Sequence, residues 1–213
     1  MDTLNTWHYE ALGKRAVQAL EKNGFTAAYF ADRASAAAHI FGLIPAEATI
    51  GIGGSQSERA LGIAERLKDG KRVIHDHNRP GLSKEEIIRA RYGQLTSDVF
   101  ICGTNALTLR GELVNTDATG NRVAAMIFGP KRVIVIAGAN KIVRNVAEAE
   151  ARIKMTAAPM NNKRFGVANP CVELGECVDC RNATRLCKIT TIISRCPTLT
   201  DFHVVVVGEA LGY

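Results

Sequence analysis

The residues with the clearest chemical potential are the cysteines, because five of the six lie between Cys171 and Cys196. Thiolates are preferred ligands of zinc and of iron–sulfur clusters. Structural zinc sites usually combine two C-x2-C pairs, whereas this region has one such pair and irregularly spaced partners. We therefore predict a 4Fe–4S cluster, with zinc as the first alternative and metal-free or disulfide-linked thiols as the second. The predicted ligands are Cys171, Cys177, Cys180 and Cys187, with Cys196 as a fifth candidate.

A second group of polar residues lies between Cys102 and Lys141, flanked by two apolar runs that are typical of buried strands. Glu112 and Asp117 are five residues apart and are the predicted catalytic acid/base pair, unless one of them only caps a helix. Arg122, at the expected start of that helix, could hold a carboxylate or phosphate, or form a plain salt bridge. Cys102 itself is expected to be a small buried side chain. Further candidates for substrate binding are Thr104, Asn105 and Asn121.

A glycine turn before a helix supplies another candidate binding element. Residues 48–52 are expected to form a strand that runs into Gly53, Gly54 and Ser55, and Ser55 has capping-box spacing to Glu58. Free backbone N–H groups at such a helix start can bind an anion, although a tight turn without a ligand has the same pattern. The dinucleotide-binding fingerprint is absent, since its third glycine is missing. His75 and His77 follow the next strand and could be proton shuttles or structural side chains.

These candidates would be positioned by alternating helices and strands, which predict an α/β fold with a layered, mostly parallel sheet flanked by helices. We expect residues 1–213 to form one domain. Residues 157–200, rich in Pro, Asn and Cys, form a predicted metal-binding insertion before the last strand, with a helix over 185–195. The predicted helices are 4–22, 33–43, 55–67, 83–96, 121–128 and 143–155, and the predicted strands are 28–30, 48–52, 71–75, 99–102, 132–137 and 203–208.

Composition excludes several classes of function. The net charge is +6, but Lys and Arg are scattered among acidic residues and only 6% of residues are aromatic, so nucleic-acid binding is not expected. No apolar run reaches the roughly 20 residues that a membrane span needs, and the N-terminus does not resemble a signal peptide. The sequence therefore predicts a cytoplasmic protein without a membrane span.

Several ordered blocks of sequence closely resemble the lactate-utilisation (LUD) domain family. The cysteine segment and the residues 207–213 are similar to the stand-alone, cysteine-bearing branch of that family. The matching blocks cover nearly the whole chain in order. They are residues 104–108, 111–117, 119–124, 129–130, 133–136 and 140–143.

This resemblance implies a fold similar to the ribose-5-phosphate isomerase and coenzyme A transferase superfamily. It also implies an association with bacterial lactate oxidation beside iron–sulfur subunits. In the sugar isomerases a loop after a strand carries a substrate-binding lysine, and Lys141 occupies the similar position here. The acidic residues that usually precede that lysine are replaced by Gly138, Ala139 and Asn140. The resemblance therefore supports anion binding by Lys141 more than it supports isomerase chemistry.

The resulting prediction is an iron–sulfur enzyme that acts on a small anionic hydroxy acid, keto acid or sugar derivative by proton transfer. The reaction would be isomerase-like or linked to a redox step. The alternatives are a non-catalytic subunit of a lactate-oxidising iron–sulfur complex and a binding protein stapled by zinc. The expected partners are the small anion and iron–sulfur subunits, and a homo-oligomer is compatible with the sequence.

Overall fold

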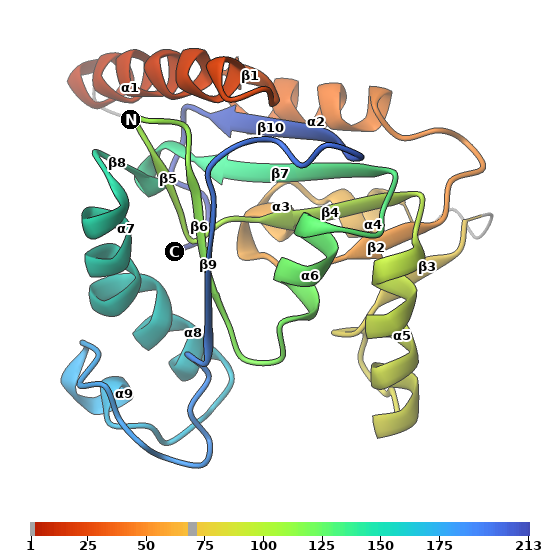
Figure 1. Ribbon diagram of the computed structural model, residues 1–213, viewed down its shortest axis with the longest axis vertical. Coiled ribbons are helices and arrows are strands. Elements are labelled where there is room, and N and C mark those ends of the chain that lie inside the picture. Colours follow the sequence, from red (N-terminus) through yellow and green to blue (C-terminus); the bar gives the residue numbers. More distant parts are fainter. Residues whose placement is uncertain (1–2, 68–71) are drawn as a thin grey trace.

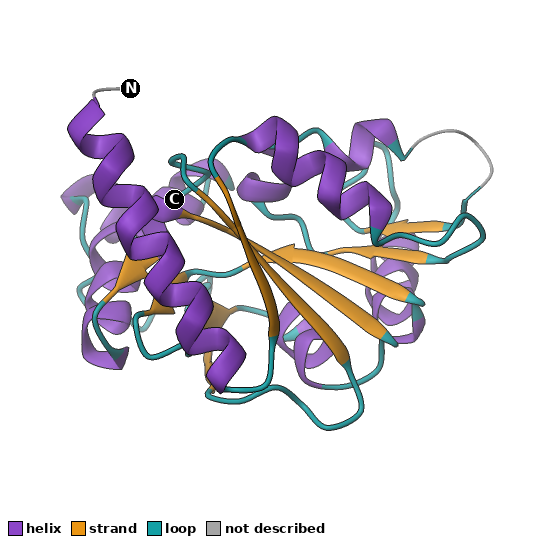
Figure 2. Cartoon of the chain, turned by 90° about the horizontal axis from the view of Figure 1, so that it is seen from above, coloured by secondary structure: helices purple, strands orange, loops and turns teal. Residues whose placement is uncertain are grey.

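The structure, a computed structural model, describes residues 3–67 and 72–213. The described residues form a main sheet of six parallel strands in the order β1-β10-β7-β4-β2-β3. The strands are β1 (Thr26–Phe30), β2 (Ile50–Ile52), β3 (Ile74–Asp76), β4 (Val99–Gly103), β7 (Arg132–Gly138) and β10 (Asp201–Val207). This arrangement confirms the predicted parallel α/β sheet, and the six strands form the fan that Figure 2 shows.

The central strands are runs of β-branched residues that are buried on both sides, as a parallel sheet between two helix layers requires. On one face, alternate side chains such as Ile134 and Val205 pack against α2 (Arg33–Gly42), α3 (Gln56–Ala60) and α4 (Ile63–Arg66). On the other face, Val133 and Val204 pack against α1 (Thr3–Lys22) and α6 (Asn121–Ile127), and Leu95 of α5 (Lys84–Thr96) adjoins this cluster. Helices therefore cover both faces of the sheet (Figures 1 and 2).

A smaller sheet lies beside the carboxyl ends of the main strands. Its order is β8-β5-β6-β9, with β8 parallel to β5 and the other neighbours antiparallel. The strands are β5 (Ala106–Thr108), β6 (Leu113–Asp117), β8 (Ile142–Val143) and β9 (Ile189–Ile193). A long helical segment packs on this sheet: α7 (Val146–Arg152), a π-helical turn (Ile153–Ala157) and α8 (Ala158–Arg164), as Figure 1 shows. The second sheet was not predicted, because its strands are too short to give a clear alternating pattern.

The predicted helix over 185–195 is wrong, since residues 189–193 form β9. Its sequence, Ile-Thr-Thr-Ile-Ile, is β-branched throughout, and such residues are stiff at χ1 and favour a pleated strand. The strand pairs antiparallel with β6, with Ile193 opposite Leu113 and Ile189 opposite Asp117. The cysteine-rich region thus supplies a strand to the smaller sheet.

Three other predicted elements differ in their bounds. The helix expected over 55–67 is divided at Gly62, which has a left-handed φ of 63°. Its predicted capping box does not form, because Ser55 accepts a hydrogen bond from Ser57 N and Glu58 accepts one from Ala64 N. The predicted helix over 143–155 starts later and runs through the π-helical turn into α8, so residues 157–164 of the expected insertion continue that helix. The third is the strand expected over 71–75, whose first residue lies outside the described residues, and β3 begins at Ile74.

The helix α5, predicted over residues 83–96, begins with a capping box in which Ser83 and Glu86 form both reciprocal hydrogen bonds. In the described part of the chain, none of the helices combines the length and the apolar character that crossing a membrane would require.

Candidate functional site

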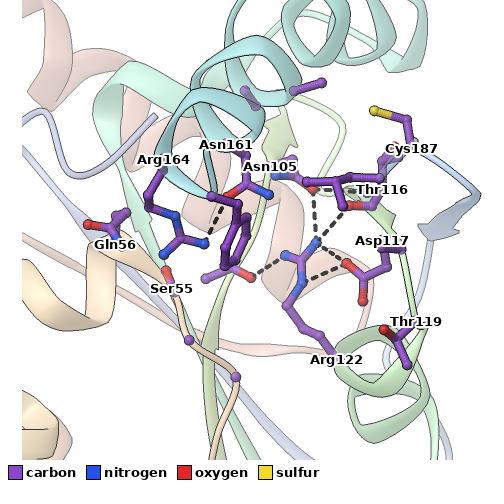
Figure 3. A pocket seen from close by; sticks show the side chains of 18 of the residues that line it. Ser55, Gln56, Asn105, Thr116, Asp117, Thr119, Arg122, Asn161, Arg164 and Cys187 are labelled. Atoms are coloured by element: carbon purple, nitrogen blue, oxygen red, sulfur yellow. Dashed lines mark hydrogen bonds and ion pairs between the residues drawn. The ribbon is translucent and has the colours of Figure 1, made fainter. Parts of the chain in front are cut away.

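A cavity of about 500 Å³ lies where the loops after β2, β3, β4 and β7 meet the helix α8. Ligand sites of open α/β sheets occur at this edge, since parallel strands all end there. The cavity brings together nine of the predicted catalytic and substrate-binding residues, several of which Figure 3 shows. They are Gly53, Gly54, Ser55, Thr104, Asn105, Asp117, Asn121, Arg122 and Lys141.

The predicted acid/base pair is not brought together. Asp117 lines the cavity, whereas Glu112 lies in the turn between β5 and β6 and is not part of the lining. There Glu112 accepts a hydrogen bond of 2.8 Å from the hydroxyl of Thr108. The two carboxylates stand at opposite ends of the strand β6, so five residues of extended chain separate them.

The glycine turn after β2 lines the cavity, and its backbone packs closely against neighbouring residues. Gly54 has a φ of 78°, and a Cβ atom there would lie 2.2 Å from Nδ2 of Asn78. The following helix α3 has only five residues, so the turn does not carry the dipole of a long helix. The turn shapes the cavity wall, with Ser55 as the capping residue of α3.

Arg122 is the centre of a buried hydrogen-bond network (Figure 3). Its Nε and Nη2 atoms donate to Oδ1 of Asp117, at 3.0 and 2.5 Å. The remaining donors reach Oδ1 of Asn105 and of Asn115, and the carbonyl oxygens of Gly103 and Thr116. The side chains of Arg122 and Asp117 are 14% and 8% exposed. Every N–H of the guanidinium is therefore engaged, and Arg122 organises the wall rather than offering its fork to a ligand.

Lys141 is the most unusual charged residue of the cavity, because it is 3% exposed and has no acidic partner among the described residues. Its Nζ donates to the hydroxyl of Ser57 at 2.7 Å and to the carbonyl oxygen of Thr104 at 3.0 Å. Burial, together with the nearby Arg152 and Arg122, lowers the pKa of Lys141 to about 7. A lysine kept in this setting fits a functional group better than a structural one.

Replacing Lys141 by methionine is expected to raise the free energy of unfolding by about 1–4 kcal/mol at pH 6, because a buried charge is exchanged for an apolar side chain of similar volume. The pKa of this lysine is lower in the folded than in the unfolded protein. The free-energy cost of burying this charged lysine is therefore complete below about pH 7. It decreases as the pH rises toward 10.5, the pKa of the unfolded state, and is absent above that pH. Urea unfolding of both proteins at pH 6 and pH 10 measures the difference. A methionine variant less stable than wild type at pH 6 would contradict it.

Several other donors face the cavity that were not predicted from the sequence. Nε of Arg91 and Nε2 of Gln56 are buried and have no hydrogen-bond partner within the described protein. Arg164 donates to Oδ1 of Asn161 at 2.8 Å, and burial lowers the pKa of Arg164. The lining thus contains four cationic side chains and one carboxylate, that of Asp117, which Arg122 neutralises. The excess positive charge favours an anionic ligand.

His77 also lines the cavity, whereas His75 lies outside it. Gln94, which is fully buried, donates from Nε2 to the carbonyl oxygen of Ile52 and to Nδ1 of His77, and accepts from Nδ2 of Asn121. The other ring nitrogen of His77, Nε2, faces Nδ2 of Asn78 at 3.3 Å. Burial lowers the pKa of His77, as does the nearby Arg91. The ring of His77 is therefore held between two side-chain amides, in an environment that favours its neutral form.

The four predicted metal ligands lie near one another, and all six cysteines are free thiols. Burial raises the pKa of Cys171, and so do the thiols of Cys180 and Cys177. Burial and the other three thiols likewise raise the pKa of Cys187. The backbone N–H of Asp179 points to Sγ of Cys177 at 3.4 Å. Cys187 also lines the ligand cavity, so the cysteine region and the cavity share a residue (Figure 3).

Cys196 and Cys102 are separate from this group. Cys196 lies beyond the strand β9, next to the end of α1, where its N–H donates to the carbonyl oxygen of Asn23. Cys102 is fully buried in β4, and burial raises its pKa to about 12. Of the five candidate metal ligands, the four predicted first, from Cys171 to Cys187, interact with one another, whereas Cys196 lies apart.

The four thiols are of the type that binds metals, but their sulfur atoms are not gathered around a common point as metal ligands are. Across residues 3–67 and 72–213, no group of three or more His, Cys, Asp or Glu side chains is arranged to hold a metal ion. The cysteine loop is nevertheless largely exposed, and the N–H pointing to Cys177 is the kind of contact that stabilises a thiolate ligand. The donor set, four thiols in one largely exposed loop, is of the kind that binds zinc or an iron–sulfur cluster.

The open parallel sheet, with a cationic cavity at the carboxyl ends of its strands, defines an α/β protein with a candidate ligand site at the usual edge of such a sheet. The chain belongs to the LUD domain family, whose model matches residues 13–207. This match confirms the resemblance predicted from the sequence blocks.

The solved structures support the same fold. A DUF162 family protein from Deinococcus radiodurans, known from a crystal structure, shares 15% sequence identity with this chain and superposes with a TM-score of 0.52. The alignment covers 93% of this chain and 98% of that protein. No curated protein matches the chain in sequence.

Proposed function

We propose that this LUD domain binds a small anionic hydroxy acid, keto acid or sugar derivative in the cavity and moves a proton beside its carbonyl group. The proposal is carried by Lys141, a buried lysine without a carboxylate partner in the wall of a cationic cavity. Arg91, Arg164 and Gln56 have donors available for the carboxylate or phosphate of the ligand. The cavity volume is sufficient for a metabolite of this size.

The proton would be moved by groups that already face the ligand. Lys141 can exchange a proton near neutral pH, because its pKa is about 7. Asp117 stays a candidate for the base that was predicted from the sequence, while Glu112 would have to act from outside the cavity.

The cysteine set is proposed to hold a 4Fe–4S cluster beside this cavity. Cys171, Cys177, Cys180 and Cys187 would be its ligands, and the cluster would supply electron transfer or a Lewis-acidic iron. Zinc held by the same thiols would only fix the loop. Because Cys187 lines the cavity, a cluster held there would lie close to a bound ligand.

A non-catalytic subunit of an iron–sulfur complex is the second candidate. The apolar side chains of Leu174 and Val178 lie among the cysteines and are 62% and 48% exposed, which suits contact with another protein. In that case the cluster would pass electrons to the partner, and the cavity would bind no metabolite.

Ligand binding distinguishes these functions. We expect pyruvate, L-lactate, ribose 5-phosphate or inorganic phosphate at millimolar concentration to raise the melting temperature of the protein. Arg164→Gln should weaken the binding by at least about tenfold, the loss typical of one charge-assisted contact. Arg144→Gln is the matched control, because Arg144 is exposed and lies outside the lining. If none of the four anions changes the melting temperature, the proposed function is wrong.

A further inference from the structure

The hydrogen bonds of Lys141 leave one direction of its amino group unoccupied by protein. The hydroxyl of Ser57 donates to the carbonyl oxygen of Leu211 at 3.1 Å, so it can only accept from Lys141. The carbonyl oxygen of Thr104 is also a pure acceptor. A neutral amine has two N–H bonds, and these two acceptors take both of them. Its lone pair is then left for the cavity, which Lys141 lines.

This geometry suits a nucleophile more than a cation that holds an anion. An ammonium group would ordinarily be placed against a carboxylate, but both partners of Lys141 are uncharged. The positive neighbours Arg152 and Arg122 disfavour a further positive charge. A desolvated lysine close to other cationic groups is the arrangement that activates an amine toward carbonyl compounds.

We propose that Lys141 forms a Schiff base with a carbonyl compound that carries a carboxylate or phosphate group. The lysine nitrogen attacks the carbonyl carbon to give a carbinolamine. This intermediate then loses water as the C=N bond forms, and both hydrogens of the amine leave with the carbonyl oxygen. No external oxidant or reductant is needed. The inference rests on the proposed ligand class and specifies the chemistry of the same site.

The cavity would orient such a carbonyl compound for attack. Arg164 and Arg91 would bind its anionic group and so direct its carbonyl carbon toward Lys141. Imine formation would make the adjacent C–H bond more acidic, because the nitrogen can accept electrons from the carbon. The Schiff base would thus supply the electron sink that proton transfer next to a carbonyl group requires.

Reductive trapping tests the proposal on the wild-type protein. Incubation with pyruvate or ribose 5-phosphate and sodium cyanoborohydride should add one reduced ligand per chain, and peptide mapping should place it on Lys141. At pH 7 a lysine with a pKa of about 7 has a neutral fraction roughly a thousandfold larger than an ordinary lysine, so surface lysines should react far more slowly. Trapping should also increase as the pH rises through about 7.

Two controls separate the possible outcomes. L-lactate has no carbonyl group and should give no adduct, and Lys141→Arg should abolish trapping while Lys154→Arg leaves it unchanged. If pyruvate raises the melting temperature but no adduct forms at Lys141, the Schiff base is disproved and the proposed binding function stands. If no anion binds and none is trapped, both fail. Equal modification of surface lysines would also overturn the assignment.

Discussion

Replacing Arg122 by alanine is expected to lower the free energy of unfolding by about 3–5 kcal/mol, the largest effect of any single substitution in the cavity wall. The substitution would leave the carboxylate of Asp117, only 8% exposed, without a counterion. It would also remove one of the two donors that each amide oxygen of Asn105 and Asn115 accepts from. Guanidinium chloride unfolding followed by circular dichroism measures the change.

The matched control is Arg144→Ala. Arg144 also pairs with an acidic residue, Glu148, but its side chain is 82% exposed, and exposed pairs contribute less than about 1 kcal/mol. The double variant Arg122→Ala, Asp117→Asn should recover part of the lost stability, because the unpaired charge is removed as well. An Arg122→Ala variant as stable as Arg144→Ala would show that the buried network does not support the cavity wall.

The second large effect concerns the metal centre. We expect the anaerobically purified protein to contain about four iron atoms and four sulfide ions per chain and to absorb broadly in the visible range. Serine at any one of the four grouped positions, Cys187 for example, should lower the iron content to a small fraction of the wild-type value. Cys196→Ser should retain the wild-type content, because the strand β9 separates Cys196 from Cys187 and places it next to the end of α1.

Elemental analysis and an absorption spectrum of these variants decide between the metals. Colourless protein with one zinc per chain would disprove the cluster and support the zinc alternative. Loss of the metal in Cys196→Ser would contradict the grouping of the four thiols. Cys102→Ala is a further control, since this thiol is fully buried in the main sheet and should not affect the metal content.

The main sheet was predictable because its strands have a simple physical signature. A parallel sheet between helices requires continuous apolar strands, and the Val-rich and Ile-rich runs of β7 and β10 fulfil this requirement. Local periodicity was insufficient for residues 185–195, where apolar positions fit a helix but β-branching and pairing with β6 give a strand. The strand β9 also determines which cysteines lie together, because it separates Cys196 from the four predicted metal ligands.

The candidate site was predictable in part for the same reason. Residues that follow parallel strands meet at one edge, so Gly53, Thr104 and Lys141 could be grouped from the sequence. Arg91 and Arg164 could not, because each is one of several charged residues on a helix and only the packing selects which one faces the cavity. The sequence also does not show that the partners of Arg122 come from two segments, residues 103–105 and 115–117.

The position of β10 has a consequence for synthesis of the protein. This strand follows all the others in the sequence, yet it lies inside the sheet between β1 and β7 and bonds to both in parallel. While the chain is being made on a ribosome, β1 therefore has no neighbour and one side of β7 stays open until residues 201–207 have emerged. The nascent chain would expose two apolar strand edges during that interval, which makes it a natural client for chaperones that bind extended hydrophobic segments.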